Sequence, residues 1–110
     1  MPPSGTNPGT SRRPIVAGNW KMNTTISEGL ALVDALLPLI GEVSRVDRVV
    51  CPPFVSLHAV SDRLRGSGIA VGAQNAYHEP KGAFTGEVSV PMLAGLVQYV
   101  IIGHSERRSV

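Results

Sequence analysis

Polar side chains follow two apolar runs of this sequence, one near its start and one near its end. Asn19 and Lys21 follow the first run, and His104 and Glu106 follow the second. An amide and an ammonium can both donate hydrogen bonds to an oxygen that carries negative charge, and a neutral imidazole can donate one to a carbonyl. Together these groups suit the polarisation of a carbonyl group.

Ala17, Asn19 and Lys21 are spaced two residues apart. If the segment is extended, their side chains are expected on the same side of it. Two hydrogen-bonding groups would then project toward one spot. A single Asn or Lys at the end of a strand is commonly a turn residue or a solvated charge, so this interpretation needs a partner elsewhere in the chain.

His104 supplies such a partner, because it follows directly on an apolar run. If Ser105 begins a helical turn, main-chain amides there point at the imidazole and favour its neutral form. Glu106 could pair with Lys21 and hold the flexible ammonium in place. A structural histidine and a plain surface carboxylate are the alternatives for His104 and Glu106.

Four short apolar runs rich in β-branched residues predict the strands that position these groups. They are continuous rather than alternating, as in strands covered on both faces. The runs are residues 15–17, 49–51, 69–71 and 100–102. Helical patterns separate them, which predicts an α/β fold with right-handed crossovers and a parallel sheet, either open and doubly wound or closed into a barrel.

The first helix has the clearest local signals. Its apolar stripe consists of Ile26, Leu30, Val33, Leu37 and Ile40. Thr25 with Glu28 forms a capping box, and Gly41 fits just past the end. Pro38 is expected to kink or end the last turn. A second helix is predicted from Pro53 to the Gly66 region, with Leu57, Val60 and Leu64 on one face.

Residues 74–87 form a polar segment that Pro80, Gly82 and Gly86 interrupt, and a loop of this length in a compact chain usually has a function. Residues 88–105 lack formal charge, but Pro91 and Gly95 break them. A short helix and a buried strand therefore explain the segment better than a membrane span does.

Composition excludes several classes of protein. The single Cys51 and the absence of a Cys/His cluster exclude a disulfide scaffold and a structural zinc site. The net charge of +2 comes from Arg12 and Arg13, so the remaining chain is neutral and no nucleic-acid partner is expected. Residues 1–13 are predicted to be a disordered tail without a signal-peptide core, and a cytoplasmic location is the natural interpretation.

Three segments in register resemble the triosephosphate isomerase family. They are residues 19–23 (Asn-Trp-Lys-Met-Asn), residues 72–87 with Gly-Ala-Gln-Asn at the start and Gly-Ala-Phe-Thr-Gly-Glu at the end, and residues 102–108 (Ile-Gly-His-Ser-Glu-Arg-Arg). The resemblance implies a TIM (β/α)₈ barrel, of which residues 14–110 would be the N-terminal half with the first four strands and their helices.

The resemblance also implies a reaction, the interconversion of dihydroxyacetone phosphate and D-glyceraldehyde 3-phosphate through an enediolate in glycolysis and gluconeogenesis, without a cofactor or metal. Asn19 and Lys21 would bind the substrate and Lys21 would stabilise its negative charge, while His104 would polarise the carbonyl. Glu106 would anchor Lys21, and Ser105 would hold the catalytic carboxylate at rest.

The long loop resembles the one through which this family forms homodimers. Thr85, near its tip, would reach Asn19 and Glu106 of a second subunit. The residues expected at that interface are Gln74, Thr85, Gly86 and Glu87.

A barrel of this type has about 250 residues, and the sequence ends at Val110. A catalytic glutamate and a glycine-rich phosphate-binding segment have no counterpart here, so the 110 residues alone are expected to be inactive. Two unpaired sheet edges would make them partly ordered or oligomeric. The alternative hypothesis is a non-catalytic half-barrel that binds a phosphorylated ligand or pairs with another chain.

Overall fold

A computed structural model describes residues 12–108 of the chain. Of the predicted N-terminal tail, residues 1–11 lie outside the described residues. At the start of the described part, the Arg13 guanidinium donates hydrogen bonds to the Asp47 carboxylate at 3.0 Å and to the Ser44 carbonyl at 2.8 Å.

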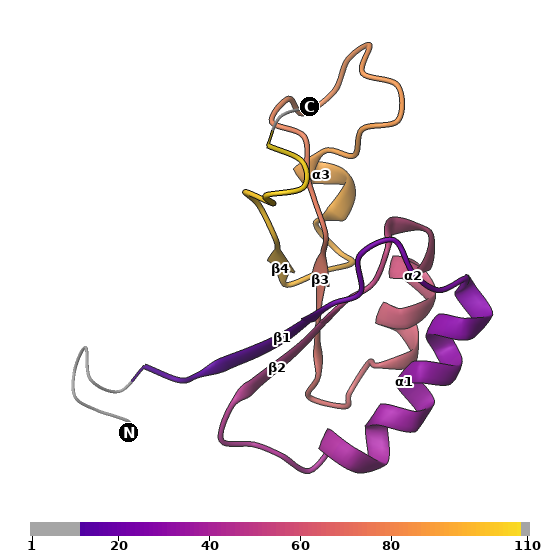
Figure 1. The fold of residues 1–110 in the computed structure, drawn as a ribbon, viewed down its shortest axis with the longest axis vertical. Helices are drawn as coiled ribbons and strands as arrows, with labels where there is room; N and C mark the ends of the chain where they lie inside the picture. The colour runs from indigo at the N-terminus through magenta and orange to yellow at the C-terminus, as the bar shows by residue number, and fades with distance from the viewer. Residues whose placement is uncertain (1–11, 109–110) are drawn as a thin grey trace.

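Four parallel strands form one sheet in the order β1-β2-β3-β4. They are β1 (Ile15–Asn19), β2 (Asp47–Cys51), β3 (Ala70–Ala73) and β4 (Tyr99–Val100), and they alternate with α1 (Ile26–Ile40), α2 (Phe54–Arg63) and the short α3 (Val90–Leu93). The predicted α/β order and parallel sheet are confirmed (Figure 1). The third and fourth strands begin one residue away from their predicted starts.

Helix α1 forms as its local signals predict. The Glu28 amide donates to Thr25 Oγ1 at 3.2 Å, and the Thr25 amide donates to Glu28 Oε1 at 2.8 Å, which completes the capping box. Gly41 is the C-cap, and its amide donates to the Leu37 carbonyl. The helix continues through Pro38 and ends at Ile40, so Pro38 lies within its last turn.

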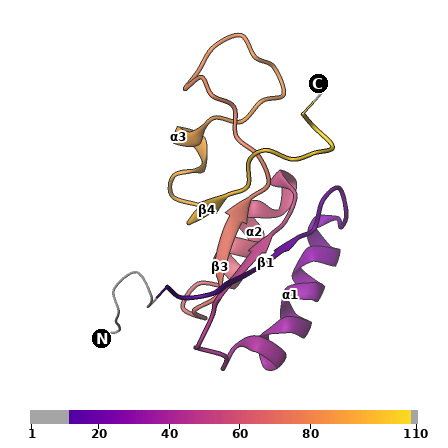
Figure 2. The same ribbon diagram turned by 60° about the vertical axis from the view of Figure 1, so that its left-hand side comes forward.

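The core lies between the sheet and the two longer helices, which lie beside each other on one side of it in both ribbon views (Figures 1 and 2). Its members are buried apolar side chains of α1, α2, β2, β3 and α3. They are Val33, Val50, Leu57, Val60, Leu64, Ile69, Val71, Ala73 and Leu93. Residues 49–51 of β2 and 71–73 of β3 are buried, although the helices of the described residues cover only one face of the sheet.

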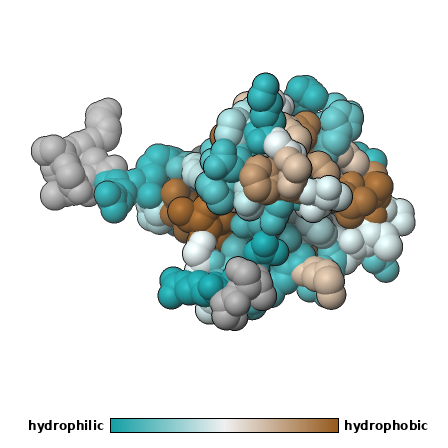
Figure 3. Space-filling view, turned by 90° about the horizontal axis from the view of Figure 1, so that it is seen from above, coloured by the Kyte–Doolittle hydropathy of each residue, from teal (hydrophilic) through white to brown (hydrophobic). Residues whose placement is uncertain are grey.

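The outer strands differ from the prediction of burial. In β1, Ile15 is 53% and Val16 62% exposed, and in β4 Val100 is 36% exposed. Each outer strand pairs with a single neighbour, and within residues 12–108 no helix lies over the second face of the sheet. Seen from above, one apolar patch lies on the side where β1 begins, and another lies on the side that carries α1 and α2 (Figure 3).

Gly72 of β3 lies against side chains of β2. A methyl group at this position would lie 2.8 Å from Cys51 Sγ and 3.3 Å from Val49 Cγ1. Both neighbours are buried in the core of the sheet, so they have little room to move. The absence of a side chain at Gly72 is thus a packing requirement.

We expect Gly72→Ala to lower the free energy of unfolding by about 1–3 kcal/mol, because the added methyl overpacks the contact with Cys51. Thermal or urea unfolding of the complete gene product that contains this sequence would measure the change. Gly95→Ala is the matched control, since a methyl there meets nothing within 4 Å. Equal stabilities of the two variants would contradict the packing argument.

Candidate functional site

The carboxyl ends of the strands meet around one open cavity of about 380 Å³. Its lining comes from the segments after β1, β3 and β4. The lining residues are Asn19, Lys21, Met22, Gln74, Asn75, His104, Glu106 and Arg107. The structure thus brings together Asn19, Lys21, His104 and Glu106 from opposite ends of the sequence.

Lys21 reaches the cavity through a turn rather than through strand alternation. Strand β1 ends at Asn19, and Lys21 has a left-handed backbone with φ of 56°. The Lys21 amide donates to Asn19 Oδ1 at 2.9 Å, and Gln74 Nε2 donates to the Lys21 carbonyl at 2.8 Å. The main-chain amide and the main-chain carbonyl of Lys21 are therefore both hydrogen-bonded to side chains.

His104 is largely enclosed, with 10% of its side chain exposed. Nε2 lies 2.5 Å from the Gln74 carbonyl oxygen, and Nδ1 lies 3.5 Å from Glu106 Oε2. Because a carbonyl oxygen only accepts, Nε2 carries the hydrogen of its bond.

The expected main-chain amides beside the His104 ring are not found among the described residues. Ser105 begins a turn rather than a helix, and the Arg107 amide closes it by donating to the His104 carbonyl at 3.1 Å. Oxygen atoms, not amide donors, therefore face the ring nitrogens of His104.

Glu106 connects the two cationic or donor groups of the site. Its Oε2 lies 3.7 Å from Lys21 Nζ as well as 3.5 Å from His104 Nδ1, and Ser105 Oγ donates to Oε1 at 3.4 Å. Its own main-chain amide, followed by Lys21 and then His104 and Ser105, lowers the pKa of the Glu106 carboxyl below its usual value. Glu106 is therefore an anion that lies beside both the Lys21 ammonium and the His104 ring.

The long loop has a defined shape and projects from the body of the molecule (Figures 1 and 2). At its base the Tyr77 amide donates to the Val88 carbonyl at 2.7 Å, and the rings of Tyr77 and Phe84 lie 4.6 Å apart. Thr85 and Gly86 are exposed and Glu87 is half-buried. Gln74, by contrast, lies at the cavity, so only part of the predicted interface set is on the projecting loop.

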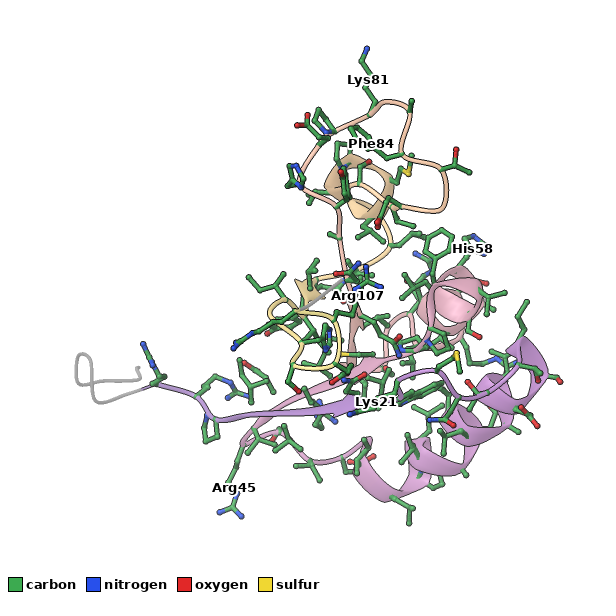
Figure 4. All side chains as sticks on the ribbon, turned by 45° about the horizontal axis from the view of Figure 1, so that its top comes forward. Lys21, Arg45, His58, Lys81, Phe84 and Arg107 are labelled. Carbon is green, nitrogen blue, oxygen red and sulfur yellow. The ribbon has the colours of Figure 1, made fainter. Side chains whose placement is uncertain are left out.

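Met22, Asn75 and Arg107 also line the cavity, and the arguments from residue type did not identify them. Figure 4 shows Lys21 and Arg107 at the same end of the sheet. Each of the three directly follows a residue that the sequence analysis named, so its position near the end of a strand could have predicted its place at the cavity.

Residues 12–108 contain no group of three or more His, Cys, Asp or Glu side chains placed to hold a metal ion. In the same part of the chain, no helix has both the length and the apolar character that crossing a membrane requires. The side-chain hydrogen-bond donors that line the cavity are amide, ammonium, imidazole and guanidinium groups.

Comparisons with known proteins agree on one family. A family model described as triosephosphate isomerase matches residues 14–110. Proteins named triosephosphate isomerase from Dehalococcoides mccartyi (strain BAV1) and Moorella thermoacetica are 50% and 57% identical over 98 residues, which are 89% and 88% of this chain but 39% of each relative. The chain thus spans about two fifths of their length.

A solved structure gives the same result. The crystal structure of triosephosphate isomerase from Bartonella henselae superposes with a TM-score of 0.82 at 40% sequence identity. The match covers 90% of this chain and 41% of that chain. The described half-barrel therefore has the architecture of part of a TIM barrel.

We expect a residue-specific NMR titration of the complete gene product to place the pKa of Glu106 below the usual glutamate range. Because the folded pKa is lowered, the stability contributed by Glu106 is present above that range and is lost as the pH falls through the lowered pKa. Lys21→Met should raise the midpoint only in part, since the main-chain amide is the larger cause.

Lys81→Met is the control for this titration, because Lys81 lies at the tip of the loop, away from Lys21 (Figure 4). It should leave the Glu106 midpoint unchanged. If Lys21→Met leaves the titration midpoint of Glu106 unchanged, the Lys21 ammonium does not act on the Glu106 carboxylate.

Proposed function

The chain belongs to the triosephosphate isomerase family, and on that premise we propose that the complete gene product interconverts dihydroxyacetone phosphate and D-glyceraldehyde 3-phosphate. The observation that carries the proposal is the shared cavity of Asn19, Lys21 and His104. The reaction would take place in the cytoplasm as a step of glycolysis and gluconeogenesis. It requires no cofactor, because a proton moves between adjacent carbons with no change in overall oxidation state.

Lys21 and Asn19 suit the binding of a substrate oxygen on which negative charge develops. Asn19 Oδ1 already accepts the Lys21 amide, so the Nδ2 group of Asn19 is left to donate to the substrate. The Lys21 ammonium would stabilise the enediolate by direct charge interaction, and Glu106 limits its range of positions.

His104 is proposed to polarise the substrate carbonyl. Its Nε2 hydrogen is bonded to the Gln74 carbonyl, so substrate would take the place of that acceptor. The His104 Nε2 hydrogen would exchange one carbonyl acceptor for another, so the number of hydrogen bonds would change little. The bond then strengthens as the substrate oxygen becomes an anion, which is how such a donor accelerates a reaction.

Glu106 is unsuited to act as the general base, because its carboxylate is held between Lys21 and His104. By family resemblance, the base is a glutamate on a later loop, and Ser105 holds that carboxylate at rest. We therefore propose that residues 1–110 alone lack activity, since general-base catalysis contributes roughly a hundredfold to ten-thousandfold.

We expect the complete gene product to isomerise triose phosphates in a coupled assay, and residues 1–110 alone not to. His104→Gln should lower kcat by about a hundredfold or more with a small change in KM, because the ring acts on charge that grows toward the transition state. Lys21→Met should impair both parameters. His58→Gln, a change of a histidine on α2 outside the cavity, is the matched control. An unchanged kcat in His104→Gln would remove His104 from the mechanism.

We further propose that the protein forms a homodimer through residues 74–87. The projecting loop would place Thr85 against the partner's Asn19 and the partner's Glu106, beside Gly86 and Glu87. Exposed apolar side chains support an interface here. Met22 lines the cavity and is 94% exposed, and Phe54 lines a second pocket together with Gly86 and Glu87 and is 56% exposed.

Thr85→Arg should raise the dissociation constant of the dimer by about tenfold or more, because a bulky charge would have to be desolvated at the interface. Analytical ultracentrifugation over a dilution series measures it. Lys81→Arg changes the same loop without adding charge and should leave association unchanged. A monomeric wild-type protein would refute the proposed dimer.

The exposed edges of β1 and β4 favour one second candidate, a non-catalytic half-barrel that pairs with another chain or binds a phosphorylated ligand. This candidate predicts no isomerase activity in any preparation of the complete gene product. It also predicts a stable complex in which β1 or β4 is protected from hydrogen exchange.

A further inference from the structure

We infer that Gln74 is a positioning residue whose side chain holds Lys21 in its left-handed turn. The inference rests on the proposed function only for its kinetic consequence. The structural observation stands independently, because one glutamine contacts both segments that carry the substrate-facing groups.

The Lys21 backbone requires an external restraint. A φ of 56° is uncommon for a residue with a side chain, and such conformations persist where the surroundings determine them. Asn19 Oδ1 restrains the Lys21 amide, but this bond spans only two residues and moves with the turn. The Gln74 bond to the Lys21 carbonyl anchors the turn to a different strand.

Both donors of the Gln74 amide group are used. Nε2 donates to the Lys21 carbonyl at 2.8 Å and to the Cys51 carbonyl at 2.9 Å. Cys51 is the last residue of β2 and is buried. The side chain thus connects the end of β3 to the end of β2 and to the turn after β1.

The main chain of Gln74 completes the connection, because its carbonyl accepts from His104 Nε2. Lys21 Nζ and His104 Nδ1 in turn share Glu106 Oε2. Lys21, His104, Gln74 and Glu106 therefore form a closed ring of contacts, in which Gln74 is the member attached directly to the central part of the sheet.

The test is Gln74→Met in the complete gene product, since methionine has a similar length but no donor. We expect kcat/KM to fall about 10- to 100-fold, the range that misplacement of a catalytic group by about 1 Å produces. Addition of Gln74→Met to Lys21→Met should cause a much smaller further loss, because residues that act as a unit are not additive.

Gln98→Met is the matched control. Gln98 Oε1 accepts the Val71 amide at 3.0 Å, so this glutamine also bonds β3, but it lies outside the cavity. Its replacement should lower the unfolding temperature and leave kcat/KM within about twofold of the wild type. Sedimentation at the assay concentration must show the same assembly state for all variants.

A crystal structure of the Gln74→Met variant provides a readout that does not depend on catalysis. We expect Lys21 to leave the left-handed region, because its carbonyl loses the Gln74 donor. A left-handed Lys21 in the variant, or full additivity with Lys21→Met, overturns the inference. An inactive wild-type protein would instead refute the proposed function, while the crystallographic comparison would still decide the positioning role.

Discussion

Parallel pairing of adjacent strands is the constraint on which the whole arrangement depends. Every strand in the sheet runs in the same direction, so the residues that follow β1, β3 and β4 lie together at the carboxyl ends of the strands. Asn19 and His104 are far apart in sequence and still line one cavity for this reason. The helices contribute indirectly, because α1 and α2 bury the core that keeps the strands in register.

Few charged side chains lie at the carboxyl ends of the strands, and the position of one affects the position of the others. One carboxylate, Glu106, faces Lys21 Nζ and His104 Nδ1 through the same oxygen atom. Exposed ion pairs contribute little to stability, so the value of this arrangement lies in orientation. A lysine has several rotatable bonds, and an anion at a defined place narrows the positions that its ammonium occupies.

Local features of the sequence predict local structure well. The Thr25 and Glu28 capping box and the apolar stripe define α1, because all of their interactions lie within a few residues. The apolar runs at β1 and β4 did not predict the exposure of these strands, since burial depends on which elements lie beside a strand. The two unpaired edges were expected only from the resemblance to a longer barrel. The same apolar pattern suits a covered strand and an edge strand.

The polar residues of the site were predictable by type but not by conformation. A left-handed backbone is typical of Gly or Asn, so nothing in a lysine indicates it at Lys21. The orientation of His104 depends on the Gln74 carbonyl, and a main-chain oxygen has no sequence signal. Gln74 itself was identified, but as an interface residue, because its segment resembles the loop through which the family forms homodimers.

That segment links the chemistry of the cavity to the shape of the projecting loop. Gln74 bonds Lys21 at one end of it, and the Tyr77 amide bonds the Val88 carbonyl just beyond. These hydrogen bonds are close in sequence and belong to one continuous backbone that leaves β3. The base of the projecting loop and the anchor of the Lys21 turn therefore lie within a few residues of each other. In the proposed dimer, contact between subunits and placement of the ammonium would consequently depend on the same short stretch of chain.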